Sequence, residues 1–177
     1  MRPIAITASC LALLSASCSA ARPSSNGTGA APALMDTVRG TLTLVGNEPL
    51  GELILTPLDQ SEVLSIAGSQ RTQLRQLRKV DIMAGGRFTG QRSYTASPRG
   101  ARVFEADTFA VRGMDGVPAQ DGIIVQQNSR YYLLVNGRRL PVEYMPKALQ
   151  GKLGARVFLA GPLEAPLIYY GVILEKP

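Results

Sequence analysis

The chain has 177 residues, 45% of them hydrophobic, which is enough for one medium domain or two small ones. It carries a net charge of +6 and no histidine, so the commonest general base and the commonest metal ligand are both missing. Both cysteines, Cys10 and Cys18, lie near the start, so the rest of the chain has no thiol chemistry, and neither a cofactor nor a metal is expected.

Residues 1–17 have the pattern of a signal peptide. Arg2 gives a positive start, and residues 4–14 form an apolar segment that is too short to span a membrane as a helix. Small residues follow, so one expected cleavage site lies after Ala20 or Ala21, and the alternative lies just before Cys18. Either site predicts an exported protein.

The alternative cleavage site depends on residues 14–18, LSASC. This segment resembles a bacterial lipobox at its first, fourth and fifth positions, although serine stands second, where leucine is usual. The resemblance implies that Cys18 becomes the first mature residue and carries lipid, which anchors the protein to a membrane with its body facing the periplasm. Ser19 follows where aspartate would imply the inner membrane, so the resemblance favours the outer membrane.

Residues 18–36 follow the apolar segment and have no hydrophobic period. They are rich in Ala, Ser, Gly and Pro, a composition typical of a flexible linker. We therefore expect the lipidated cysteine and a tether in this range, ahead of a folded body that begins at residue 37.

From residue 37 onward the hydrophobic period is mostly two, as in strands, with two helical interruptions. A helix is expected at 69–79, with Ser69 as its N-cap, and a second helix at 146–154. A long loop is expected at 86–102 and a connector at 114–122. The predicted strands are 38–45, 51–57, 62–68, 80–86 and 103–113, then 121–126, 131–135, 138–144, 155–161 and 166–175.

One sequence pattern occurs twice, at 74–86 and at 149–162. Spaced leucines lead into a short strand with valine, then isoleucine or leucine, then glycine. This sequence pattern occurs together with an order of three strands, one helix and two strands in each half. The combination resembles the OB-fold, a five-stranded barrel. The resemblance implies that the leucines plug one end of a barrel and that the strand enters its core. The implied positions are Leu74, Leu77, Val80, Ile82 and Gly85, then Leu149, Leu153, Val157, Leu159 and Gly161.

The expected fold is therefore mainly β, with two tandem five-stranded OB-like barrels at 37–117 and 118–177. Each has one short helix between its third and fourth strands. A single larger Greek-key barrel or sandwich remains the alternative. Val157 and Leu159 alternate with Phe158 and Ala160, so both faces of that strand are apolar. Such a strand predicts that the two halves pack against each other.

The positive charge is concentrated in residues 71–102, which hold eight basic residues and a single acidic one, Asp81. In OB-folds the loop between the fourth and fifth strands often grips oligonucleotides or oligosaccharides, and aromatic rings among arginines suit such ligands. An ordinary solvated surface is the competing interpretation. The candidate binding residues in this loop are Arg87, Phe88, Arg92, Tyr94, Arg99 and Arg102.

Carboxylates near the connector give a weaker hypothesis. Glu105, Asp107, Asp115 and Asp121 offer a pair for the acid–base work of a hydrolase. Glycine follows both Asp115 and Asp121, however, and Asp-Gly is most simply a turn. No catalytic residue is therefore assigned.

The sequence predicts a non-enzymatic, exported envelope lipoprotein that acts as a binding or assembly module through its β-barrels. Its expected partners are the membrane, through the N-terminal lipid, and another envelope protein or an anionic polymer. The alternative function is binding of a polyanion by the loop at 86–102, with an anionic glycan or lipid headgroup preferred to single-stranded nucleic acid.

Overall fold

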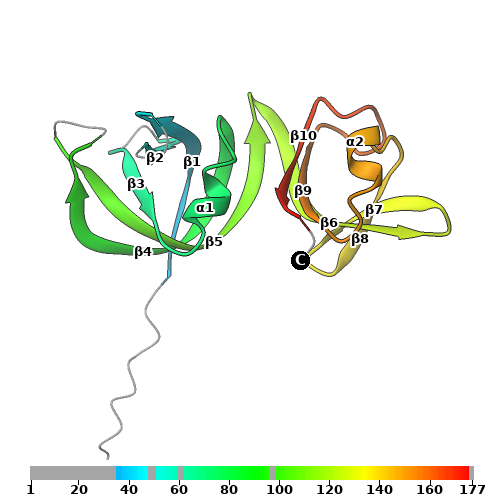
Figure 1. Ribbon diagram of the computed structural model, residues 1–177, viewed down its shortest axis with the longest axis horizontal. Coiled ribbons are helices and arrows are strands. Elements are labelled where there is room, and N and C mark those ends of the chain that lie inside the picture. The colour runs from blue at the N-terminus through cyan, green and yellow to red at the C-terminus, as the bar shows by residue number, and fades with distance from the viewer. Residues whose placement is uncertain (1–34, 48–50, 60–61, 96–98, 176–177) are drawn as a thin grey trace, which may run out of the picture. The chain divides into compact units, whose positions relative to one another are not determined.

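The computed structural model describes residues 35–47, 51–59, 62–95 and 99–175. The described chain is mainly β, and in each half three strands, one short helix and two strands follow one another, as the sequence predicts (Figure 1). The signal peptide, Cys18 and nearly all of the expected tether lie outside the described residues. The first half contains β1 (Asp36–Val45), β2 (Glu52–Pro57), β3 (Leu64–Ala67), α1 (Arg71–Leu74), β4 (Val80–Ser93) and β5 (Ala101–Met114). The second half contains β6 (Val117–Gln127), β7 (Arg130–Val135), β8 (Arg138–Val142), α2 (Lys147–Gln150), β9 (Arg156–Ala160) and β10 (Tyr169–Leu174).

The five strands of the first half pair in a closed circuit. β1 pairs with β2, β2 with β3, and β4 with both β1 and β5, all antiparallel. β3 and β5 complete the circuit as a parallel pair, from Leu64 opposite Arg102 to Ala67 opposite Glu105. Every strand of this half therefore pairs with a neighbour on each side along part of its length.

The second half follows the same order but stays open between β8 and β10. β6 pairs with β7 and with β9, β7 pairs with β8, and β9 pairs with β10. Within the described residues no ladder joins β8 to β10. The two halves thus share an element order and differ in how their strands close.

The link between the halves is a tight turn, so the prediction of a connector at 114–122 is wrong. Met114 pairs with Val117, and only Asp115 and Gly116 lie between them. Both have positive φ, 48° and 79°, as a type I′ hairpin turn requires. The residues expected to form the rest of the connector belong to β6, which continues antiparallel to β5.

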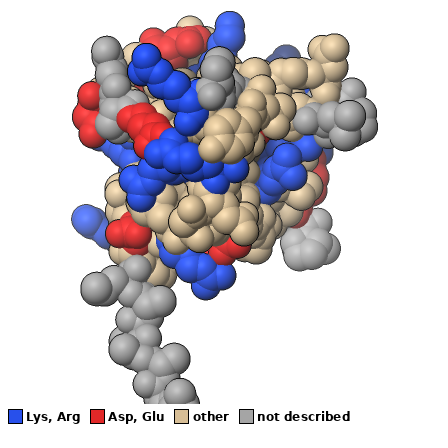
Figure 2. Space-filling model, turned by 90° about the vertical axis from the view of Figure 1, so that its left-hand side faces the viewer, with Lys and Arg blue, Asp and Glu red and all other residues tan. Residues whose placement is uncertain are grey.

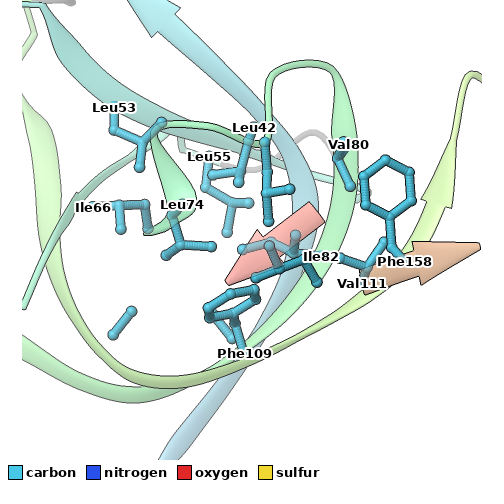
Figure 3. Packing of buried hydrophobic residues seen from close by; sticks show 14 of the residues in the cluster. Leu42, Leu53, Leu55, Ile66, Leu74, Val80, Ile82, Phe109, Val111 and Phe158 are labelled. Atoms are coloured by element: carbon cyan, nitrogen blue, oxygen red, sulfur yellow. The ribbon is translucent and has the colours of Figure 1, made fainter. Parts of the chain in front are cut away.

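The hydrophobic core has two clusters, and β9 contributes to both. Val157 and Leu159 lie in the cluster of the second half, whereas Phe158 and Ala160 lie in the cluster of the first. Figure 3 shows Phe158 among the buried side chains of the first half. The prediction that both faces of this strand are buried is confirmed. Burying a phenylalanine is worth about 1.5–3 kcal/mol, so this contact holds the halves together.

Polar contacts reinforce the junction between the halves. Asp121 on β6 accepts a hydrogen bond from the backbone N–H of Val111 on β5 at 3.0 Å. Its other oxygen accepts from Nε of Arg156 at 2.9 Å, and Nη2 of Arg156 donates to the Phe109 carbonyl at 2.7 Å. The Arg156 guanidinium also stacks on the Phe109 ring, 4.4 Å from its centroid. A carboxylate and a guanidinium from the second half therefore clamp β5.

Both helices are much shorter than predicted. Each has a single turn, and the side chain of Ser69 does not cap α1. Leu74 and Leu77 are nevertheless buried, and Leu149 is buried after them, so these leucines do pack into the core. Leu153 is 41% exposed, so the expectation that it plugs the second half is wrong. Because α2 ends at Gln150, Leu153 no longer follows Leu149 on one helical face.

The segment predicted to be a long loop, 86–102, is mostly a β-hairpin. β4 continues to Ser93 and β5 begins at Ala101, so the two strands form a long antiparallel pair. Register shifts between Gly85 and Gly86 and between Phe88 and Arg92 interrupt this ladder. The outer part of the hairpin lacks apolar alternation because it extends beyond the core, where backbone hydrogen bonds alone form the ladder.

Candidate functional site

The first half is filled by α1 at one end and hollowed at the other. α1 connects the end of β3 to the start of β4, and its Leu74 belongs to the same buried cluster as Leu42 on β1. At the opposite ends of the same strands a cavity of about 400 Å³ opens. We call it the mouth cavity, and all five strands or the residues next to them line it. Its lining is Thr37, Val38, Arg39, Pro57, Leu58, Asp59, Glu62, Leu64, Phe88 and Arg102.

The mouth cavity combines an apolar wall with charged side chains. Val38, Leu64 and Phe88 supply the wall, and Leu58, 53% exposed, stands at its opening. Half of the lining residues are polar or charged, so the cavity is more polar than most small-molecule sites, but its volume lies within their usual range. The cavity therefore has the size of a ligand site.

Within this lining, Phe88 and Arg102 contact each other. The Phe88 ring packs edge-on against the buried ring of Phe104, with centroids 5.1 Å apart and an interplanar angle of 69°. On Phe88 lies the guanidinium of Arg102, with Cζ 3.9 Å from the ring centroid. A cation–π contact of this kind is worth about 0.5–1 kcal/mol at an exposed site. The core thus positions Phe88, and Phe88 positions the Arg102 guanidinium.

Arg92 makes its contacts beside the turn of the β4–β5 hairpin. Its Nη1 donates to the Gly100 carbonyl at 2.7 Å and to the Arg99 carbonyl at 3.3 Å. The same guanidinium forms an ion pair with Glu62, which belongs to the mouth cavity lining. Arg92 therefore fastens the segment before β3 to the turn before β5.

Arg87 is also paired. Its Nε and Nη2 lie 2.8 and 2.7 Å from one oxygen of Glu105 on the neighbouring strand. The Arg87 side chain is 62% exposed, so this pair contributes little to stability. It does, however, neutralise one of the charges that the sequence assigned to an anion site.

The remaining predicted residues lie apart from the mouth cavity. Tyr94 is 66% exposed, and its ring covers Gly100, where an added Cβ would lie 2.8 Å from a ring carbon. Arg99 is exposed and lines none of the cavities that surround the hairpin. A smaller hollow of about 160 Å³ lies on the other side of the Phe88–Arg102 stack and includes Arg92.

The structure therefore brings Phe88 and Arg102 together at the mouth cavity, and places Arg92 beside it. Sequence reasoning missed Arg39 and Thr37, which join the same cavity from β1. Both occupy outward positions in an alternating strand, where a polar residue is the expected choice and gives no signal of a site.

Charges of both signs lie on this end of the molecule. Figure 2 shows Lys and Arg gathered across the face, with Asp and Glu directly beside them. Among the described residues, the side chains of Arg39 and Arg102 make no ion pair, in contrast to Arg87 and Arg92. Arg39 and Arg102 thus line the mouth cavity without an ion pair to a described residue, although Asp59 and Glu62 belong to the same lining.

Three of the four carboxylates considered for hydrolysis have a structural role. Asp121 is bound by Arg156 and Val111, Glu105 pairs with Arg87, and Asp115 forms the hairpin turn. In the part of the chain that the structure describes, no group of three or more metal-ligating side chains gathers. No helix among the described residues is long and apolar enough to cross a membrane.

Comparison of the chain with protein-family models, with curated proteins and with solved structures gave no match.

Proposed function

We propose that the protein is a non-enzymatic binding module of the cell envelope, exported and held to a membrane by lipid on Cys18. In this proposal its body consists of two tandem OB-like barrels, and the mouth cavity of the first is the recognition site. The closed circuit of five strands and the helix between the third and fourth strands support the first barrel. The matching element order supports the second, which is open between β8 and β10.

The observation that carries the proposal is the mouth cavity. Barrel mouths are a preferred location of ligand sites, and α1 lies at the other end of the strands, away from this one. The cavity contains Phe88, held by the core, and Arg102, held by Phe88. A site whose side chains are fixed before binding loses less entropy when a ligand arrives.

Photo-crosslinking in the native envelope tests this site. We would replace Leu58, at the cavity opening, by p-benzoylphenylalanine, and make the same replacement at Tyr144 as a control. Both side chains are exposed to a similar extent, 53% and 55%, but Tyr144 follows β8 in the second half. We expect a covalent adduct from position 58 and none from position 144. Equal labelling, or no adduct from position 58, would contradict recognition at the mouth cavity.

The lipid anchor has its own test. Cys18→Ala should release the protein from the membrane fraction, because acyl chains contribute about 0.8 kcal/mol for each buried methylene. Cys10→Ala is the matched control, since Cys10 lies within the apolar segment of the signal peptide and should leave fractionation unchanged. Membrane attachment of the Cys18→Ala protein would refute lipidation at this residue.

The ion pairs of Arg87 and Arg92 weigh against a broad polyanion site on the hairpin. Each of these arginines already has a carboxylate partner, and Glu62 adds negative charge to the cavity itself. A polyanion site should lose affinity steeply as salt increases, because several counterions are released on binding. Polyanion binding that weakens steeply with salt and is abolished by Arg92→Glu, Arg99→Glu and Arg102→Glu would favour the alternative function.

A further inference from the structure

The mouth cavity holds two positive and two negative side chains. Arg39 and Arg102 share the lining with Asp59 and Glu62. Glu62 forms an ion pair with Arg92, which lies outside the lining. Counted together with Arg92, these charged side chains carry one net positive charge. That balance suits a ligand with one negative charge and disfavours a dense polyanion.

The stacking of Arg102 leaves its hydrogen-bonding edge available. Cζ of Arg102 lies 3.9 Å from the Phe88 ring centroid, and a cation–π contact of this kind uses none of the guanidinium N–H groups to bind an oxygen acceptor. Among the described residues no acceptor is bound to these N–H groups. A carboxylate is the acceptor that fits such a fork with two parallel hydrogen bonds. Arg39, in the same lining, supplies a second guanidinium.

The apolar wall requires that the ligand have an apolar part as well. Val38, Leu64 and Phe88 lie in the lining with the two arginines, and Leu58 extends the apolar surface to the opening. A small anion such as acetate would leave this wall in contact with water. Contact with an alkyl chain would remove this apolar surface from water, which favours binding.

We propose that the mouth cavity binds a small amphiphilic monoanion. Its head group, a carboxylate or a group of the same charge, is bound by Arg102 and Arg39, and its apolar part lies against Val38, Leu64 and Phe88. This proposal rests on the proposed function, in which the same cavity is the recognition site, and it adds the chemical class of the ligand.

Sodium octanoate is the probe that tests the ligand class. It would be titrated into the full chain carrying Cys18→Ser, which changes no described residue, and followed by amide chemical shifts in NMR. Acetate lacks the apolar part, 1-octanol lacks the charge, and octylammonium reverses it. We expect octanoate to shift amides of the cavity lining, and each of the three comparison compounds to bind at least about tenfold more weakly, as a charge-assisted pair and a buried chain both predict.

Variants distinguish the two arginines of the cavity from their neighbours. Arg102→Gln and Arg39→Gln should each weaken octanoate binding on the order of tenfold, because each removes a charged donor. The Arg39 side chain makes no hydrogen bond, ion pair or ring contact with another described residue, so Arg39→Gln breaks no polar contact, even if Arg102→Gln disturbs Phe88. Arg87→Gln is the matched control, since Arg87 is paired with Glu105 outside the cavity, and it should leave binding unchanged.

The outcomes separate this inference from the function on which it rests. Equal binding of octanoate and 1-octanol at the cavity would overturn the monoanion and leave mouth recognition standing. An absence of octanoate shifts at the cavity, together with a crosslinked adduct from position 58, would also overturn the monoanion and leave recognition at the mouth cavity standing. Octanoate shifts confined to other parts of the chain would overturn the inference. Octanoate binding at the cavity that weakens in both arginine variants, but not in the control, supports it.

Discussion

Removing the Asp121 carboxylate is the most informative test of how the two halves are joined. The side chain of Asp121 is 8% exposed, and it accepts hydrogen bonds from Arg156 and from the backbone N–H of Val111. In Asp121→Ala both donors lose their acceptor, and the N–H of Val111, a fully buried residue, is left without one. The free energy of unfolding should therefore fall markedly.

The expected magnitude follows from the two losses. A hydrogen bond to a charged group is worth about 1.5–3 kcal/mol, and an unsatisfied buried donor costs about 1–3 kcal/mol. The Arg156 side chain is 28% exposed and still donates to the Phe109 carbonyl, so water and this contact reduce the first loss. We expect Asp121→Ala to cost about 3 kcal/mol in total. Asp121→Asn keeps an acceptor for Val111 and should cost about half as much.

Urea unfolding followed by circular dichroism measures this change. Asp107→Ala is the control, because Asp107 is exposed on β5, and it should change the free energy of unfolding by less than about 0.5 kcal/mol. The double variant with Arg156→Ala should cost less than the sum of the single variants, since the two side chains interact directly. A cost for Asp121→Ala no larger than that of the control would refute the clamp between the halves.

Three further predictions, two of them with a matched control variant, test other features of the fold. Ser129→Gly should raise the free energy of unfolding by about 1 kcal/mol, because Ser129 has φ of 62° in the turn between β6 and β7. Gly137 occupies the corresponding position of the next turn, so Gly137→Ala should lower the melting temperature instead. Phe158→Ala should cost about 3–5 kcal/mol in urea unfolding, and a cost below 1 kcal/mol would contradict its burial between the halves. Gly86→Ala should cost about 2 kcal/mol by the same measurement, because its Cβ would lie 1.9 Å from the Glu105 carbonyl oxygen, whereas Gly151→Ala meets open space and should be nearly neutral.

The strand pattern could be predicted because a period of two is a local property of the chain. Alternation at 157–160 correctly indicated that Phe158 and Val157 enter different parts of the core. Helix lengths could not be predicted in the same way. The polar residues after Leu74 are compatible with a helix, but the chain turns instead, and Lys79 takes φ of 60° before β4 begins. Tertiary packing of the leucines decided that geometry over local propensity.

The candidate site was predicted only in part, for a similar reason. Aromatic and arginine residues in one segment made Phe88 and Arg102 candidates, and the structure places both in the lining of the mouth cavity. Arg92 looked equivalent to them in sequence, yet it pairs with Glu62, thirty positions earlier in the chain. Arg39 gave no signal, because its contribution depends on β1 lying next to β4.

By itself, the sequence determined the order of strands and helices, the mainly β character and the two-sided burial of β9. These follow from hydrophobic period and turn chemistry, which act between residues close together in the chain. Only the tertiary structure decided the parallel pairing of β3 with β5, the clamp at Asp121 and the partners of each arginine. Which charge meets which depends on strands brought together from distant positions, and no local pattern records that pairing.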